Sequence, residues 1–438
     1  MGVTQRLDGF FHITERGSDI RTEIHGGILV FLSMVYIIVV NTSMMVDAGM
    51  DYSACYSATI IMAVIGSLLM ALYARYPVAM APTMGVNAFF TYTVVIGLQF
   101  SWQEALLAVV ISGVIFFVMA VSGVRKIVIE QIPKSLRHGI TAGIGCFIVF
   151  IGLQNAGIIV DSPTLVGIGS FSDPSVILAM VCIILTLFMS ARKVPGAIFI
   201  GMALTTLMGV VTGIITIPSS IVAAPAMPDI GAFLDGISPD VLSMDFLMVV
   251  VALTFVQFFD STGTLMAIGE RAGLIDEDGN VKCEEALRVD SATSVVSGIV
   301  GATPTGSYAE STVGIEAGAR TGLMPLVVAC LFAVSLMIGP LFSVVDYSCT
   351  IGAMLMVGAA MITQLKEIEW DDWPVSVAVL GTILMMVLAY SITDGIVFGV
   401  IFYCISMIGA GRWREVGPAI YILAVISVLY LVLVVGSL

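Results

Sequence analysis

The sequence GATPTGSYAES at residues 301–311 lies deep in a very apolar chain and is followed at 312–322 by TVGIEAGARTG. Pro304 and two glycines interrupt a stretch where a membrane-spanning helix is expected, and Glu310 adds a carboxylate to the break. Irregular backbone at membrane depth is tolerated only where it is buried in protein or lines a cavity. An ionisable residue at that depth is a candidate for function. We therefore expect the rest of the chain to enclose this break.

The composition is that of a polytopic helical membrane protein. Of 438 residues, 59% are hydrophobic and 11% are charged, whereas about 25% are charged in a typical soluble domain. Apolar runs of about 20 residues recur from residue 22 onwards, and the polar first 20 residues predict no cleavable signal peptide. The net charge of −14 and the scattered basic residues argue against a nucleic-acid partner. The seven cysteines have no CxxC spacing, so no metal site or disulfide framework is expected.

The apolar runs predict fifteen spans, and the basic residues predict their orientation. With a cytoplasmic N-terminus, all 17 Lys and Arg residues fall in predicted inside segments or at the adjoining span ends. This distribution places the N-terminus inside and the C-terminus outside. The predicted spans are 22–45, 52–74, 78–98, 102–123, 133–156, 174–191, 195–215, 246–269, 285–301, 303–318, 320–345, 347–366, 372–390, 394–411 and 416–437.

The order of the spans suggests an inverted repeat. Seven spans precede a Pro- and Asp-rich outside segment at 216–245, which is expected to be an extracellular linker. Because seven is odd, spans 8–14 enter the membrane upside down relative to spans 1–7 and can repeat them in inverted form. The last span, at 416–438, then lies outside the repeat.

The third span of each half carries the same kind of break. Each has a Pro-bearing extended piece, a polar residue and a short helix-compatible run, in YPVAMAPTMGVNAFFTYTVV at 76–95 and GATPTGSYAESTVGIEAGA at 301–319. We expect the N-termini of the two half-helices to meet near the midplane, where their free N–H groups favour anionic or acceptor groups. Two broken spans in corresponding positions indicate a transporter binding site.

A second carboxylate lies on span eight, in LTFVQFFDSTGTLMAIG at 253–269. Gln257, Asp260 and Thr264 are spaced to share one helix face. A carboxylate facing lipid costs several kcal/mol, so this face is expected to line a cavity or the bundle interior. Asp260 and Glu310 would then form an intramembrane pair that accepts hydrogen bonds from ligand N–H groups, with Phe89 and Tyr308 close enough in sequence to flank a planar ligand.

Structural alternatives stand beside these functional interpretations. Asp260 could bond to backbone or hydroxyl groups as packing, and Glu310 could cap its own half-helix. Asn87 could be a packing amide or a ligand amide. Asp290 is expected to be structural, and Glu316 is expected to pair with Arg320 four residues later.

Several long motifs resemble one transporter family. They are RTEIHGGILVFLSMVYIIVVN at 21–41, APTMGVNAFFTYTVV at 81–95, SWQEALLAVVISGVIFF at 101–117, IPKSLRHGITAGIGCFI at 132–148, FFDSTGTL at 258–265 and YAESTVGIEAGARTGL at 308–323. In this order they resemble the adenine/guanine/hypoxanthine permeases, the AzgA-like branch related to the nucleobase–ascorbate transporters. The resemblance runs from residue 22 to about residue 414.

The resemblance implies an all-α membrane protein with a 7+7 inverted repeat, whose third and tenth spans are each a short strand followed by a half-helix. It implies a core domain at 22–123 and 246–345 that moves against a gate domain at 133–215 and 347–411, after a cytoplasmic segment at 1–21. It also implies that Asp260 and Glu310 bind a purine between the half-helices. The further substrate contacts that it implies are Asn87, Thr264 and the backbone N–H groups of Met84, Gly85, Val86 and Ala309.

Three departures from the family pattern lie beside this pocket. Gln257 stands where a second acidic residue is usual, and Thr83 replaces the first glycine of GMGxNAFF. Pro304 and Gly306 stand where Ser, Thr or Val is common. These departures leave the preferred purine open.

We therefore expect a plasma-membrane secondary transporter that imports hypoxanthine, guanine or adenine by cation symport and is not an enzyme. The expected coupling ion is H⁺, with Na⁺ as the alternative, and no other cofactor is expected. The expected partners are a purine nucleobase and the lipid bilayer, and the sequence does not decide whether the chain forms a homodimer. The main rival is an anion transporter on the same fold, which half-helix N-termini alone would suit. An intramembrane enzyme would need a catalytic constellation that the three peripheral histidines do not provide.

Overall fold

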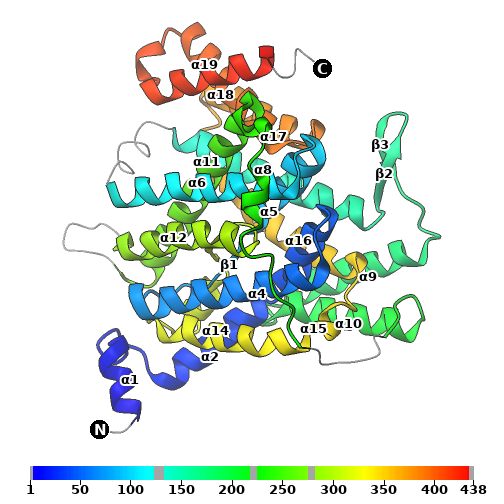
Figure 1. Ribbon diagram of the computed structural model, residues 1–438, viewed down its shortest axis with the longest axis vertical. Coiled ribbons are helices and arrows are strands. Elements are labelled where there is room, and N and C mark those ends of the chain that lie inside the picture. The colour runs from blue at the N-terminus through cyan, green and yellow to red at the C-terminus, as the bar shows by residue number, and fades with distance from the viewer. Residues whose placement is uncertain (1–2, 123–132, 218–223, 275–281, 434–438) are drawn as a thin grey trace.

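The computed structural model describes residues 3–122, 133–217, 224–274 and 282–433 (Figure 1). Nine helices in these ranges are long and apolar enough to cross a membrane, and four shorter apolar helices accompany them. Each of the fifteen predicted spans coincides with a helical element, to within a few residues at most ends. The predicted class, a helical polytopic membrane protein with two strand-plus-half-helix spans, is therefore confirmed.

The first half contains the predicted spans 1–7. Span one is a helix that is interrupted at Val35 and Tyr36, and span three begins as a strand. A hairpin of two short strands between spans five and six was not predicted. The elements are α1 (Val3–Phe11), α2 (Ile20–Met34), α3 (Ile37–Asp47), α4 (Tyr52–Leu69), the π-helical η1 (Met70–Ala74), β1 (Met80–Pro82), α5 (Met84–Ala88), the π-helical η2 (Phe89–Gly97), α6 (Trp102–Ser122), α8 (Lys134–Asn155), β2 (Ile159–Ser162), β3 (Leu165–Ile168), α9 (Pro174–Ala191) and α10 (Ala197–Val211).

The second half repeats this order of elements, with a strand and a short helix again in the third position. The elements are the 3₁₀-helices η3 (Ala232–Gly236) and η4 (Pro239–Leu242), then α11 (Met244–Arg271), α12 (Glu284–Val300), β4 (Thr305–Ser307), α13 (Ser311–Glu316), α14 (Leu323–Ser335), η5 (Leu336–Ile338), α15 (Gly339–Phe342), α16 (Tyr347–Ile362), η6 (Thr363–Glu367), α17 (Trp373–Leu388), α18 (Ile392–Gly409), η7 (Trp413–Glu415) and α19 (Pro418–Leu433).

The two broken spans meet through their strands. β1 pairs with β4 in antiparallel register, with Ala81 opposite Gly306. Backbone hydrogen bonds continue the pairing on both sides, from the Thr83 N–H to the Pro304 carbonyl (3.0 Å) and from the Tyr308 N–H to the Ala79 carbonyl (3.0 Å). All residues of both strands are buried. Each strand therefore supplies hydrogen-bond partners that the other needs where water is absent.

Helix starts follow from local capping chemistry. The carboxylate of Asp51 accepts backbone N–H groups at the start of α4, and the carboxylate of Asp346 accepts the Ser348 N–H at the start of α16. Asp173 does the same for α9, where Pro174 occupies the first helical position. Pro fits this position because the first-turn N–H that it lacks would have no intrahelical acceptor.

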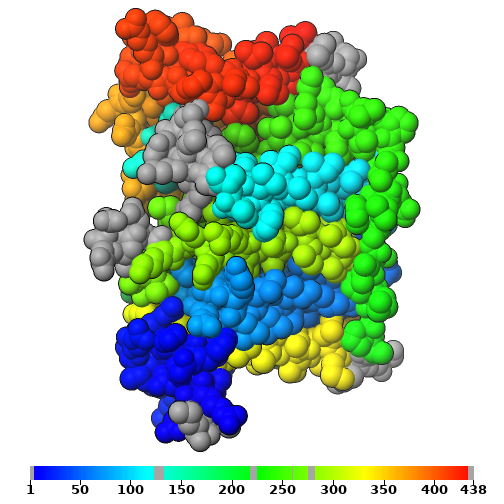
Figure 2. Space-filling model, turned by 60° about the vertical axis from the view of Figure 1, so that its left-hand side comes forward, coloured from blue at the N-terminus to red at the C-terminus, as the bar shows by residue number. Residues whose placement is uncertain are grey.

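The long helices stack as parallel layers. In Figure 2 the helices α14, α4, α12 and α6 cross one face as successive bands, and α19 lies at the end of the stack farthest from α1. Helix α6 packs on α12, and α14 packs on both α2 and α4. Helices α8, α9, α16, α17 and α18 form a second packed group.

The segment that was expected to be a linker is bound to the helix ends. Between residues 224 and 243 the chain crosses the stack and places η3 against α6. The Gly231 N–H donates to the Ile299 carbonyl (2.8 Å), and the Ser238 hydroxyl donates to Glu104. Gly236 lies so close to α6 that an added Cβ would be 2.3 Å from the Gln103 carbonyl oxygen. The segment is thus fixed to the ends of α6 and α12.

The expected ion pair between Glu316 and Arg320 is wrong. Helix α13 ends at Glu316, and Gly318 then has a φ of 105°, so the two residues do not share a helix face. Glu316 instead lies 3.9 Å from Arg271 at the end of α11. The Arg320 guanidinium donates to the backbone carbonyls of Ile315 and Ala319.

Asp290 connects α12, α11 and β4, as its expected structural role requires. Its fully buried carboxylate accepts the Ser261 hydroxyl (2.6 Å), the Ser307 N–H (2.9 Å) and the Ser307 hydroxyl (2.5 Å). Hydrogen bonds to a charged acceptor contribute more than neutral ones, and a buried donor without an acceptor is costly.

We predict that Asp290→Ala strongly destabilises the fold. The substitution leaves three buried donors without their acceptor, at about 1–3 kcal/mol each. The measurement is the melting temperature of the purified protein in detergent, with Asp346→Ala as the control. Asp346 caps α16 at an exposed position, so its loss costs about 1 kcal/mol. Equal melting temperatures for the two variants would contradict the role of Asp290.

Candidate functional site

The break at 301–311 forms the start of α13 and carries Glu310 as the residue before its first turn. The Glu310 side chain makes no capping hydrogen bond to this helix, so the alternative of a simple cap is wrong. It is half-buried, and its Oε1 accepts a hydrogen bond from the Tyr36 hydroxyl at 2.8 Å. Tyr36 lies 274 residues away in sequence, at the interruption of span one. No feature of the local sequence indicated this contact.

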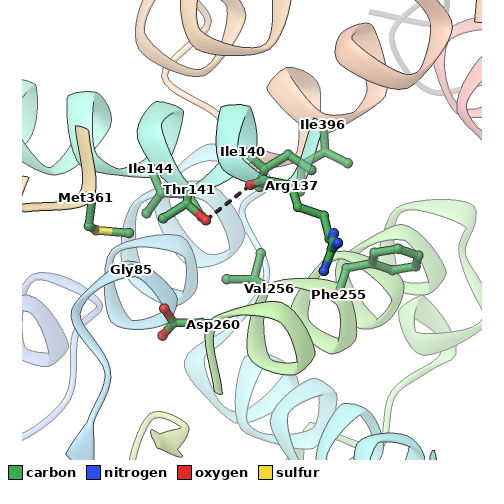
Figure 3. Close-up of a pocket in the computed structure, with 10 residues that line it drawn as sticks. All are labelled: Gly85, Arg137, Ile140, Thr141, Ile144, Phe255, Val256, Asp260, Met361 and Ile396. Carbon is green, nitrogen blue, oxygen red and sulfur yellow. Dashed lines mark hydrogen bonds between the residues drawn. The ribbon is translucent and has the colours of Figure 1, made fainter. Parts of the chain in front are cut away.

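Asp260 lies on α11 and faces a cavity between the two groups of helices. The space between the lining atoms amounts to about 430 Å³, a value that includes open solvent. Figure 3 shows the Asp260 carboxylate at its lower edge, below Gly85. The lining residues are Gly85, Arg137, Ile140, Thr141, Ile144, Phe255, Val256, Asp260, Met361 and Ile396.

The cavity is lined by residues from both of the domains that the sequence analysis expected. Gly85 and Asp260 come from spans three and eight, whereas Arg137, Thr141, Met361 and Ile396 come from α8, α16 and α18. None of these last four residues was predicted to belong to the site. Figure 3 shows the Arg137 guanidinium beside the Phe255 ring and the Thr141 hydroxyl bonded to the Arg137 carbonyl.

Gly85 allows α8 to approach the first half-helix. A Cβ at this position would lie 2.8 Å from Ile144 Cγ2, closer than side-chain atoms pack. Met84 and Val86 on either side are buried. Of residues 84–86, only Gly85 lines the cavity.

Asn87 has no hydrogen-bond partner for either atom of its amide among the described residues. Its side chain is fully buried on α5. An unpaired buried amide costs free energy, so such a group is usually explained by a ligand, a water molecule or strain. The packing alternative for Asn87 would require hydrogen-bond partners that the described residues do not provide.

Other predicted contacts lie away from the cavity. The Gln257 amide donates to the Ser112 hydroxyl on α6 (3.1 Å), so its side chain packs between helices. The Tyr308 hydroxyl donates to the Pro82 carbonyl (2.7 Å), and Phe89 is fully buried in the main hydrophobic core. Thr264 is half-buried one turn beyond Asp260, and Ala309 is exposed. Of the predicted contacts, only Asp260 and Gly85 are among the lining residues of this cavity; the others, including Glu310 and Asn87, are not.

The departures at Thr83, Pro304 and Gly306 are in mutual contact. The Thr83 backbone N–H and hydroxyl both donate to the Pro304 carbonyl. A Cβ at Gly306 would lie 2.9 Å from Thr83 Cγ2. The side chain that this chain adds at position 83 thus fills the space left by the glycine at position 306, and the two departures compensate each other.

Three buried or half-buried carboxylates gather around the break. Asp260 lies within electrostatic reach of both Glu310 and Asp290. None of the ion pairs found among the described residues includes any of the three. Asp290 is saturated by donors from the protein, whereas Glu310 has one such donor and Asp260 faces the cavity. Asp260 and Glu310 therefore retain acceptor capacity for a ligand.

Comparison with known proteins agrees with this architecture. The family model named Xan_ur_permease, described as a permease family, matches residues 21–398. The chain is 40% identical over 435 residues to the guanine/hypoxanthine permease PbuG of Bacillus subtilis, covering 97% of this chain and 99% of that protein. It is 37% identical over 437 residues to the adenine permease AdeP of Escherichia coli, covering 98% and 96%.

A solved structure has the same fold at low sequence identity. The transmembrane domain of the bicarbonate transporter BicA from a cyanobacterium aligns with a TM-score of 0.63 and 17% identity, covering 87% of this chain and 97% of that chain. The curated relatives carry the names of permeases, in agreement with the prediction of a transporter rather than an enzyme. By its match over residues 21–398 and its full-length relatives, the chain belongs to the Xan_ur_permease family of membrane permeases.

Proposed function

We propose that this permease imports purine nucleobases by cation symport, with Asp260 and Glu310 as the acceptors for the base. The observation that carries the proposal is a cavity lined by the Asp260 carboxylate and by Gly85 of the first half-helix, in a chain closely related to purine permeases. Purine bases present N–H donors on a planar ring. Ionised acceptors form stronger hydrogen bonds with such donors than neutral acceptors do.

The two groups of helices would act as a core and a gate. Helices from spans 1–4 and 8–11 pack mainly on one another, as α6 on α12 and α14 on α4. Helices from spans 5–7 and 12–14 form the other group, with α17 on α18 and α16 on α8. The cavity lies where these groups face each other. A movement of one group against the other would change which side of the membrane the cavity reaches.

The part of α11 that follows Asp260 carries several exposed residues. Gly263, Met266, Ala267 and Glu270 are exposed along α11 between Asp260 and the end of the helix, and Ala309 beside Glu310 is exposed as well. Apart from Met266 these residues are small or charged, and we propose that they line a water-filled vestibule. With the orientation proposed from the basic residues, this end of α11 is cytoplasmic.

A polar cluster closes the opposite side. Asp47 at the end of α3 accepts hydrogen bonds from Tyr92 (2.8 Å) and from Tyr347 at the start of α16 (2.5 Å). The Asn155 amide at the end of α8 donates to the Tyr92 hydroxyl (2.9 Å). Tyr390 packs edge-on against Tyr92 at a centroid distance of 6.1 Å. Because Asp47 and Tyr92 belong to the core group and Tyr347 and Asn155 to the gate group, this outer cluster would hold an inward-facing state.

The anion-transporter alternative is less well supported. The likeness to BicA is a likeness of fold, since only 17% of residues are identical. The Asp260 carboxylate, which lines the cavity, would repel an anionic substrate. Inhibition of uptake by bicarbonate but not by purines would favour this alternative.

We predict that wild-type protein imports a radiolabelled purine into cells that lack their own carriers, and that Glu310→Gln and Asp260→Asn reduce this uptake. Loss of a hydrogen bond to a charged acceptor costs about 1.5–3 kcal/mol, which corresponds to a reduction of roughly tenfold or more. The panel is hypoxanthine, guanine, adenine and uracil, and Glu367→Gln serves as the exposed control. Equal uptake by wild type and Glu310→Gln would exclude the role of Glu310. Uptake that is insensitive to both proton and sodium gradients would exclude cation symport.

We also predict that Tyr347→Phe shifts the population towards an outward-open state. The variant loses a hydrogen bond to a charged acceptor. The ratio of molecules with a closed outer cluster to molecules with an open one therefore falls by about tenfold. Hydrogen–deuterium exchange measures this change as faster exchange in peptides covering 41–50 and 345–355. The control is Tyr421→Phe, whose hydroxyl bonds to the Trp413 carbonyl near the far end of the stack. Unchanged exchange in Tyr347→Phe would show that the outer cluster does not hold the closed state.

A further inference from the structure

We propose that Tyr36 is a positioning residue for substrate binding, which acts by holding the Glu310 carboxylate in place. This assignment rests on the proposed function, because it concerns how Glu310 meets the purine. Tyr36 does not line the central cavity among the described residues and is almost fully buried, with 1% of its side chain exposed. Its contribution is therefore expected to pass through Glu310.

Tyr36 occupies the point where span one is distorted. Helix α2 ends at Met34 and α3 begins at Ile37. Around the junction the backbone tightens, because the Ile38 N–H bonds to the Val35 carbonyl and the Val39 N–H bonds to the Tyr36 carbonyl, each three residues earlier. Local tightening of a helix changes the direction in which its side chains point, and such irregularities often mark functional positions. Here it accompanies a tyrosine whose hydroxyl reaches the start of α13.

Among the described residues, buried tyrosines donate either to backbone carbonyls or, like Tyr36, Tyr92 and Tyr430, to carboxylates. The hydroxyls of Tyr56, Tyr76 and Tyr308 donate to the backbone carbonyls of Ser335, Leu265 and Pro82. These bonds satisfy a buried hydroxyl, as packing requires. The Tyr36 hydroxyl instead donates to an ionisable side chain that the proposed function places in contact with substrate.

Glu310 is thereby fixed at both its backbone and its side chain. Tyr308, two residues before Glu310, is held by the bond from its N–H to the Ala79 carbonyl, the Glu310 carbonyl accepts the Val313 N–H, and Tyr36 holds Oε1. A long, flexible side chain loses rotamer freedom when it binds a ligand, and prior fixation removes much of that cost. With Oε1 occupied, Oε2 is the oxygen directed to the N–H of the base. Because Tyr36 and Glu310 both belong to the core group, the bond can persist while the gate moves.

The test is Tyr36→Phe in the full-length protein, with binding and uptake of the purine that the wild type takes up best. Loss of a charge-assisted hydrogen bond predicts about a tenfold rise in Kd and in KM. Vmax and the melting temperature stay close to wild type, because the ring still fills its site. A purely structural role would instead lower Vmax by reducing the amount of folded protein. The matched control is Tyr56→Phe, which removes a buried hydroxyl far from Glu310 and leaves Kd within about twofold of wild type.

A double-mutant cycle with Glu310→Gln provides the second measurement. A neutral amide oxygen accepts a weaker hydrogen bond, so Tyr36→Phe changes the Kd of Glu310→Gln by only about threefold or less. Kd values for Tyr36→Phe within twofold of wild type, or equal effects in both backgrounds, would overturn the assignment of Tyr36 alone. Absence of purine binding and uptake by the wild type would overturn the proposed function together with this assignment.

Discussion

The pairing of β1 with β4 is the constraint on which the other features of the site depend. Each strand is extended backbone at membrane depth, where an unpaired N–H or C=O costs several kcal/mol. The two strands come from spans more than 220 residues apart and satisfy each other, with two further backbone bonds beyond their ends. Once they are paired, the half-helices α5 and α13 start beside each other. A break that would be unstable in one span becomes stable when two breaks combine.

Side chains around the strands protect this pairing. The Asp290 carboxylate on α12 accepts three hydrogen bonds from α11 and β4 and thereby anchors β4 to both helices. Thr83 and Gly306 fit each other across the two strands, so a bulky residue is accepted at one position because the other has no side chain. The charge of Asp290 is thus used for architecture. The nearby Asp260 and Glu310 lack such saturation and remain available to a ligand.

A division between fixed and adjustable contacts is also what transport by a movement of two groups of helices requires. Glu310 is held by Tyr36 within one group of helices, whereas the cavity in front of Asp260 is completed by residues of the other group, such as Ile144 and Met361. The outer cluster around Asp47 connects the two groups by single side-chain hydrogen bonds. Bonds within a group can remain during a movement of one group against the other, while bonds between groups can break at modest cost.

The sequence by itself determined the number and order of the spans, the two breaks, the acidic residues near them and the family, because apolar run length, glycine, proline and motif order are local properties. It also predicted the structural role of Asp290. It did not predict the Tyr36–Glu310 bond, the gate-side residues of the cavity or the outer cluster, because these contacts join residues that lie far apart in the chain. Helix-face spacing grouped Gln257 with Asp260, but only the packing of α6 against α11 decided that Gln257 faces Ser112. Likewise, the local sequence suggested that Glu316 pairs with Arg320, and only the end of α13 showed that no common helix face exists.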